Sequence, residues 1–301
     1  MIRYQNYYRD MNKVSLINIE TNDLAKYRED CFAEIKKDTP FYGILLNGGF
    51  GDDSIKANIG KVHTYYEDYK RWQTIKTYDD VLKTGERYSY NLKFDGYHIV
   101  RESEILKPFQ DYIEYISKFI YKDFPDSFNS VSLKDVDSKV LKSKIRNALK
   151  MDNWIYITGA IRSGRTYCAI ALVNGSANKG NTNLAFLDSA KEIRELANLF
   201  FDNQNSFMNE FNKLKNSHLL VLDGFGNEYV NDIVRDSIII PLLQYRAQNN
   251  LMTIFTSDFD IEDLLTLYSK KDNNNVRTKQ LSSILHSKIP DEIITSKNSI
   301  Y

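Results

Sequence analysis

The segment Gly159–Thr166 constrains this chain most, because it fits the phosphate-binding pattern G-x-x-x-x-G-K-[ST] at every position but one. An apolar run of strand type, 153–158, precedes it, and a helix-like run, 167–173, follows it. A strand, a glycine turn and a helix N-terminus together direct backbone N–H groups at an anion. We therefore predict a nucleotide-binding loop whose contacts come from Gly159, Ser163, Gly164, Arg165 and Thr166.

The one departure in this segment is Arg165, which stands where the pattern has lysine. Arginine keeps the positive charge but is longer, planar and fork-shaped. Phosphate binding can survive this change, because backbone N–H groups and the helix dipole supply much of it. Hydrolysis is more sensitive, since a misplacement of about 1 Å can cost roughly 100-fold in rate. Three interpretations stay open: a nucleotide-binding protein with little hydrolysis, an active ATPase, and a nucleotide-free adaptor with a relic of the loop.

A second nucleotide motif follows about sixty residues later. The apolar strand 219–222 ends in Asp223, which is what orienting a Mg²⁺ ion at the carboxyl end of a strand requires. Thr166 is the hydroxyl ligand expected for the same ion. We therefore predict that ATP or ADP binds with Mg²⁺ held by Thr166 and Asp223.

The catalytic positions after this strand are less regular. A second acid usually follows the first and polarises the attacking water, but Gly224 stands there, and the nearest acid, Glu228, is displaced by a turn. A polar side chain after the strand 252–256 normally senses the γ-phosphate, and here it is Asp258, whose charge repels phosphate unless Mg²⁺ or a proton intervenes. The candidate catalytic residues are Asp223, Glu228 and Asp258.

The whole composition is that of a soluble globular chain of two domains. It has 301 residues, 42% hydrophobic and 27% charged, with a net charge of zero, so it has no global attraction to nucleic acid or to anionic membrane. The start, Met1–Asn6, lacks an apolar leader, and the run Ile238–Leu243 is too short to span a bilayer. We expect a cytoplasmic protein with no membrane contact.

Metal binding other than Mg²⁺ is not indicated. The two cysteines, Cys31 and Cys168, have no metal-ligand spacing, and the four histidines are scattered. We therefore expect no zinc.

The second half alternates strand-like and helix-like segments, which is typical of a parallel α/β sheet with flanking helices. We predict two domains, 1–120 and 121–301, with the sheet in the second and a smaller α+β domain before it. The five candidate strands of the sheet are 153–158, 183–187, 219–222, 252–256 and 292–295.

The first half is less regular. Residues 21–37 predict an amphipathic helix, and residues 86–101 predict one or two strands around an Asp95–Gly96 turn. The glycine cluster 43–53 is interpreted as a turn or mobile loop. Apolar residues over 109–120 have helical spacing and predict one helix.

Two groups of residues have alternative interpretations. Arg235 and Arg246 are either solvated helix residues or contacts to DNA or another subunit. A mixture of aromatic and basic side chains can stack on nucleic-acid bases, although it more often forms a core and its rim. This mixture consists of Tyr65, Tyr66, Tyr69, Arg71 and Trp72.

The motifs of the second half resemble those of bacterial replicative-helicase loaders of the DnaI and DnaC type, most closely the DnaI branch. The segment 219–228 is similar to the loader pattern LxLDDxGxE, and the segments 234–236, 241–246, 255–260 and 294–298 match in order and spacing. The resemblance implies an AAA+ fold that binds ATP, an N-terminal domain that binds the hexameric replicative helicase, and a role in placing it on single-stranded DNA. Contact with that DNA and self-association are further expectations from it.

Departures from the loader pattern imply weakened chemistry. Loaders have lysine at Arg165, an acid at Gly224 and asparagine at Asp258, and they carry arginines near the C-terminus where this chain has only Arg277. The zinc module of the DnaI branch has no Cys/His counterpart here. We therefore expect a primosomal, loader-like protein that hydrolyses ATP slowly or not at all.

Overall fold

The computed structural model describes residues 21–136, 138–151, 153–270, 272 and 275–295. It divides into two compact units, Met1–Tyr112 and Ile113–Tyr301, and helix α6 (Lys107–Ile116) crosses from one to the other. The sequence start Met1–Asn6 and the loader-like residues 296–298 lie outside the described residues.

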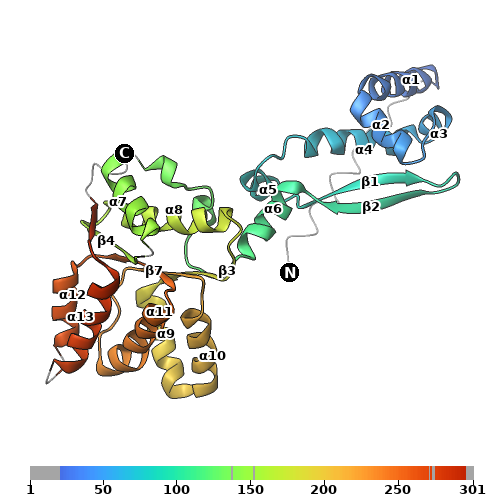
Figure 1. Cartoon of the computed structure of the whole chain (residues 1–301). Coiled ribbons are helices and arrows are strands. Elements are labelled where there is room, and N and C mark those ends of the chain that lie inside the picture. The colour runs from blue at the N-terminus through green and yellow to red at the C-terminus, as the bar shows by residue number, and fades with distance from the viewer. Residues whose placement is uncertain (1–20, 137, 152, 271, 273–274, 296–301) are drawn as a thin grey trace, which may run out of the picture. The chain divides into compact units, whose positions relative to one another are not determined.

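The N-terminal unit joins a group of helices to a two-stranded antiparallel hairpin (Figure 1). The turn of the hairpin is fixed by Asp95, whose side chain accepts hydrogen bonds from the N–H groups of Tyr97 and His98. The elements of this unit are α1 (Thr21–Lys37), α2 (Thr39–Asn47), α3 (Asp52–Ala57), α4 (Ile59–Trp72), α5 (Tyr78–Thr84), β1 (Tyr88–Phe94) and β2 (Ile99–Ile105).

Aromatic side chains form much of the core of this unit. Phe41 of α2 is fully buried against Tyr65 and Tyr66 of α4, with ring centroids 5.1 and 4.8 Å apart. Leu92 of β1 adds the hairpin to the same core. Tyr65 and Tyr66 are the two most buried residues of the aromatic and basic mixture, and they therefore belong to the core of this unit.

The C-terminal unit is built on a six-stranded sheet with the order β3-β5-β6-β7-β4-β8, in which all described pairings are parallel. The carboxyl ends of its strands therefore meet at one edge, where parallel α/β sheets bind ligands. Its strands are β3 (Phe119–Lys122), β4 (Ile155–Gly159), β5 (Leu184–Asp188), β6 (Leu219–Asp223), β7 (Met252–Ser257) and β8 (Ile293–Thr295).

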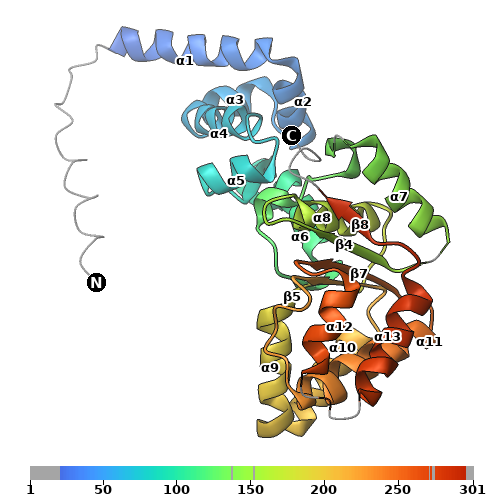
Figure 2. The ribbon, with the colours of Figure 1, turned by 90° about the vertical axis from the view of Figure 1, so that its left-hand side faces the viewer.

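Helices cover both faces of this sheet, and successive strand residues alternate between two cores. Ile155 and Ile157 of β4 face α7 and α8, whereas Tyr156 faces the helices of the other side. Figures 1 and 2 show α7 and α8 on one face and α9 to α13 on the other. These helices are α7 (Lys139–Lys150), α8 (Arg165–Asn178), α9 (Ser189–Asp202), α10 (Gln204–Lys215), α11 (Ile240–Gln248), α12 (Ile261–Ser269) and α13 (Val276–Lys288).

Shorter helical segments complete the unit. Two are 3₁₀ turns between β3 and α7, and one is a π-helical segment that runs directly into α11 just before Pro241. They are η2 (Asp126–Phe128), η3 (Leu133–Asp135) and η4 (Val234–Ile239).

The predicted fold class is confirmed: a parallel sheet with flanking helices forms the C-terminal unit, and a smaller α+β unit precedes it. Two local predictions were wrong. The helix over 109–120 ends at Ile116, and Phe119–Lys122 forms the edge strand β3, paired with β5. Within the glycine cluster, Gly43 lies inside α2 rather than in a loop.

Candidate nucleotide site

The loop between β4 and α8 has the backbone that its glycines predict. Gly159 has φ +149° and Gly164 has φ +84°, values that residues with a Cβ rarely adopt. A Cβ at Gly159 would also overlap the carbonyl oxygen of Thr295 in β8. Gly164 caps α8, so the loop leads into a helix N-terminus, where free N–H groups and the helix dipole favour an anion.

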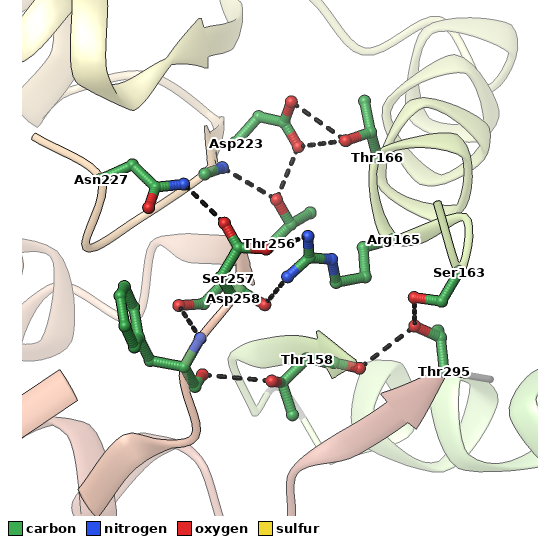
Figure 3. A network of polar contacts seen from close by, with 12 residues as sticks. Thr158, Ser163, Arg165, Thr166, Asp223, Asn227, Thr256, Ser257, Asp258 and Thr295 are labelled. Atoms are coloured by element: carbon green, nitrogen blue, oxygen red, sulfur yellow. Dashed lines mark hydrogen bonds and ion pairs between the residues drawn. The ribbon is translucent and has the colours of Figure 1, made fainter. Parts of the chain in front are cut away.

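Ser163 joins this loop to the edge strand β8. Its hydroxyl lies 2.6 Å from Thr295 Oγ1, which donates to the carbonyl of Thr158 at 3.1 Å (Figure 3). The N–H of Ser163 donates to the carbonyl of Ala160 at 3.1 Å, and the side chain is buried. The hydroxyl and the N–H of Ser163 are therefore already hydrogen-bonded, the first to β8 and the second within the loop. Contact of Ser163 with a nucleotide stays a prediction.

Thr166 and Asp223, the two predicted Mg²⁺ ligands, lie together. Thr166 Oγ1 donates to Asp223 Oδ1 at 2.8 Å, and Thr256 Oγ1 of β7 donates to the same oxygen at 2.6 Å (Figure 3). Burial raises the pKa of Asp223, although these two hydroxyl donors oppose the shift. The carboxylate and the Thr166 hydroxyl are oxygen donors of the kind that Mg²⁺ prefers.

Arg165 and Asp258, two of the departures from the loader pattern, contact each other. The Arg165 guanidinium donates through Nη1 to the carbonyl oxygen of Ser257 and through Nη2 to Asp258 Oδ1 (Figure 3). The Arg165 side chain is only 14% exposed in this position. Its charge is therefore paired with a carboxylate at the end of β7.

Asn227 holds the other oxygen of Asp258. Its amide Nδ2 donates to Asp258 Oδ2 at 2.9 Å, from the turn that follows β6. Burial raises the pKa of Asp258, but the hydrogen bonds from Asn227 and Arg165 outweigh it and leave that pKa below its usual range. Asp258 is thus a fixed negative charge, and Asp223, with its raised pKa, is the carboxyl that more readily holds a proton.

Glu228, the third predicted catalytic acid, is directed away from these residues. It is 4% exposed, and its carboxylate accepts hydrogen bonds from Tyr268 Oη, from Ser189 Oγ at 3.1 Å and from the N–H of Gly226 at 2.9 Å. The structure therefore brings Asp223 and Asp258 to the loop and places Glu228 in the core beside α12.

The two arginines with alternative interpretations are both buried. Arg246 is fully buried, and its guanidinium donates to the carbonyls of Leu214 and Ser217 at 3.0 and 2.9 Å. Burial lowers the pKa of Arg246 to about 9, which keeps it charged at neutral pH. Arg235, 3% exposed, pairs with Asp236, so neither side chain is placed to contact DNA. Arg277 is exposed on α13 and donates to Gln280.

No other metal or membrane feature stands out in the described part of the chain. No group of three or more His, Cys, Asp or Glu residues there is arranged to hold a metal ion. None of the helices between residues 21 and 295, leaving aside the undescribed positions, is long and apolar enough to cross a membrane. Zinc independence stays a prediction.

Three residues of the site were not identified from the sequence: Thr256, Asn227 and Thr295. Each is a short polar side chain that holds a predicted residue in place, namely Asp223, Asp258 and Ser163. Their signal is weak, because a threonine in a β-strand and an asparagine in a turn are both common, and only the folded sheet shows what each of them contacts.

Comparisons with known proteins agree with the motifs. No protein-family model matches the chain. The replicative helicase loader DnaI of Bacillus subtilis (strain 168) is 24% identical over 260 residues, which cover 80% of this chain and 82% of that protein. A crystal structure of DnaI has a TM-score of 0.51 at 24% identity and covers 60% of this chain and 98% of its own. A crystal structure of the DnaC helicase loader has a TM-score of 0.44 at 18% identity, covering 57% and 100%. The predicted resemblance to DnaI-type loaders is confirmed.

Proposed function

We propose that this chain, which is similar to the DnaI type of replicative helicase loader along most of its length, is a loader-like protein of DNA replication. In this proposal it binds ATP or ADP with Mg²⁺ at the loop 159–166 and hydrolyses ATP slowly or not at all. Its N-terminal unit binds the hexameric replicative helicase, and its C-terminal unit carries the nucleotide.

Nucleotide binding rests mainly on one observation, the 2.8 Å contact between Thr166 and Asp223 beside a phosphate-binding loop. A hydroxyl at the first turn of α8 and a carboxylate at the end of β6 come from segments 57 residues apart and meet at the ligand-binding edge of the sheet. Thr166 and Asp223 would hold a Mg²⁺ ion there, which would supply positive charge beside the phosphates. The loop backbone supplies N–H donors beside it.

Slow hydrolysis is supported by the placement of the acids and by Arg165, whose guanidinium is paired with Asp258. Gly224 has no side chain to polarise a water, and Glu228 is occupied by Tyr268 in the core. Losing one preorganised electrostatic contact typically costs about 100- to 1,000-fold in rate, and such effects are not additive. We therefore expect the chemical step to be strongly impaired while nucleotide binding persists.

Nucleotide titration of the full chain by calorimetry, with and without Mg²⁺, tests the proposal. We expect saturable binding of ADP or ATP that weakens without Mg²⁺. Gly164→Val should abolish it, because a β-branched residue is strained at φ +84° and blocks the backbone from the phosphate. Gly175→Val in α8, where a new Cβ meets open space, is the matched control and should bind as the wild type does.

Two results would replace the proposal with its alternatives. If the wild type binds neither nucleotide at millimolar concentration, the loop is a relic and the chain is a nucleotide-free adaptor. ATP turnover on the order of 1 per second with single-stranded DNA present would instead identify an active DNA-dependent ATPase.

A further inference from the structure

The end of β7 occupies a particular place in the sheet. β7 lies between β4, which leads into the phosphate-binding loop, and β6, which ends in Asp223. In the register of these strands Thr158 pairs with Ser257. A phosphate chain bound at the loop and directed toward Asp223 would therefore pass the end of β7, and its last phosphate would lie beside that end.

The group that this terminal phosphate would meet is Asp258. Its carboxylate accepts hydrogen bonds from Arg165 on one oxygen and from Asn227 on the other. Both partners favour the ionised form, and the pKa of Asp258 lies below its usual range. Asp258 is therefore negatively charged at neutral pH, and it is held rather than free to rotate away.

Arg165, the cation that replaces the lysine of the loop, cannot offset this charge for a ligand. Its guanidinium is already shared between Asp258 and the carbonyl oxygen of Ser257. A third phosphate would have to break this ion pair or accept the carboxylate as a neighbour. The first two phosphates would need neither, because the backbone N–H groups of the loop and the N-terminus of α8 would contact them.

From these contacts we infer that the site selects a nucleoside diphosphate over a nucleoside triphosphate, with the Asp258–Arg165 pair excluding the third phosphate. This inference rests on the proposed function, since it concerns the same loop. Two like charges about 4 Å apart repel strongly even where solvent screens them partly. We therefore expect ADP to bind at least about tenfold more tightly than ATP.

The test is a pair of calorimetric titrations of the full-length wild-type chain with Mg²⁺, one with ADP and one with a non-hydrolysable ATP analogue. The wild type should show the tenfold preference for ADP. Asp258→Asn removes the charge, keeps an oxygen that can accept from Arg165, and should tighten triphosphate binding about tenfold relative to ADP binding. Arg165→Lys cannot make both guanidinium contacts and should shift the ratio in the same direction.

Asp260→Asn is the control, because Asp260 is an exposed acid two residues away that caps α12, a role asparagine also fills. It should leave the ratio of the two affinities as in the wild type. The inference is overturned if the wild type binds the triphosphate as tightly as ADP, or if Asp260→Asn changes the ratio as much as Asp258→Asn does. Absence of binding for both ligands would overturn the proposed function itself, which distinguishes the two failures.

Discussion

Glu228 shows how a single acid can belong to the fold rather than to the site. Burial raises the pKa of Glu228, and its hydrogen bonds from Tyr268, Gly226 and Ser189 oppose that shift only in part. A carboxyl whose pKa is higher in the folded than in the unfolded state stabilises the fold at low pH. That contribution is lost as the pH rises through the raised, folded-state pKa.

We predict that Glu228→Gln removes this pH dependence. The free energy of unfolding of the wild type, measured relative to the variant by urea titration, should fall as the pH rises from about 4 to about 8. Nucleotide affinity should not change, because the side chain does not reach the loop. Glu195→Gln, an exposed acid on α9, should leave the pH dependence as in the wild type. A constant difference across this range, or loss of nucleotide binding, would contradict the placement of Glu228.

The sequence predicted the loop and Asp223 because their signal is concentrated in short, contiguous patterns. Arg165 and Asp258 stand out in the sequence as two separate departures from the loader pattern. Nothing in the sequence predicts their contact, because 93 residues separate them. Their contact exists only because β7 is inserted between β6 and β4 in the sheet. Arg246 is a similar case, because helical spacing does not reveal that its hydrogen-bond partners are buried carbonyl groups.

At the scale of elements, strands with a strong pattern were predictable and short ones were not. The hairpin and the five strands 153–158 to 292–295 were expected near where the structure has them. The four residues of β3 carry too few positions to separate a strand from the continuation of a helix. Only pairing with β5 decides their conformation, and that pairing is a property of the folded sheet.

Two glycines of the first unit show the same dependence on neighbours. Gly43 lies within α2 with open space around it, whereas Gly49 has φ +87° and a Cβ there would overlap the carbonyl oxygen of Phe94 in β1. Gly49 therefore lets the hairpin approach the turn after α2, where the Phe94 N–H also donates to the carbonyl oxygen of Gly48 at 2.7 Å.

We predict opposite effects of alanine at these two glycines. Gly49→Ala should lower the free energy of unfolding by roughly 1–3 kcal/mol, because it adds backbone strain and a clash with β1. Gly43→Ala should raise it by about 0.5–1 kcal/mol, since alanine is favoured in a helix interior. Urea unfolding of the fragment 1–118, in which Trp72 is the one tryptophan, followed by its fluorescence, measures both. Equal effects of the two substitutions would argue against the close approach at Gly49.

At the scale of the whole molecule, each unit has its own hydrophobic core. Phe41, Tyr65 and Leu92 lie in a core made only of residues from the N-terminal unit, whereas the two cores of the C-terminal unit surround its sheet. A core of buried apolar side chains can support a fold without a structural metal. Separate cores are what the proposed division of labour requires, since each unit would have to fold on its own side chains.

We predict that the N-terminal unit retains the replicative helicase on its own, without zinc. Its exposed aromatic side chains, among them Tyr27, Tyr88 and Tyr97, suit an interface, because aromatic residues are enriched at binding hot spots. The measurement is a pull-down of the purified helicase with two fragments, 1–118 and 107–301, which both keep α6 intact, in buffer containing a zinc chelator. The fragment 1–118 should bind the helicase with an affinity within about tenfold of that of the full chain, and 107–301 should bind nucleotide but not helicase.

Retention of the helicase by 107–301 alone would reverse the assigned roles. Loss of binding in the chelator, restored by added zinc, would show that a metal completes the N-terminal interface after all.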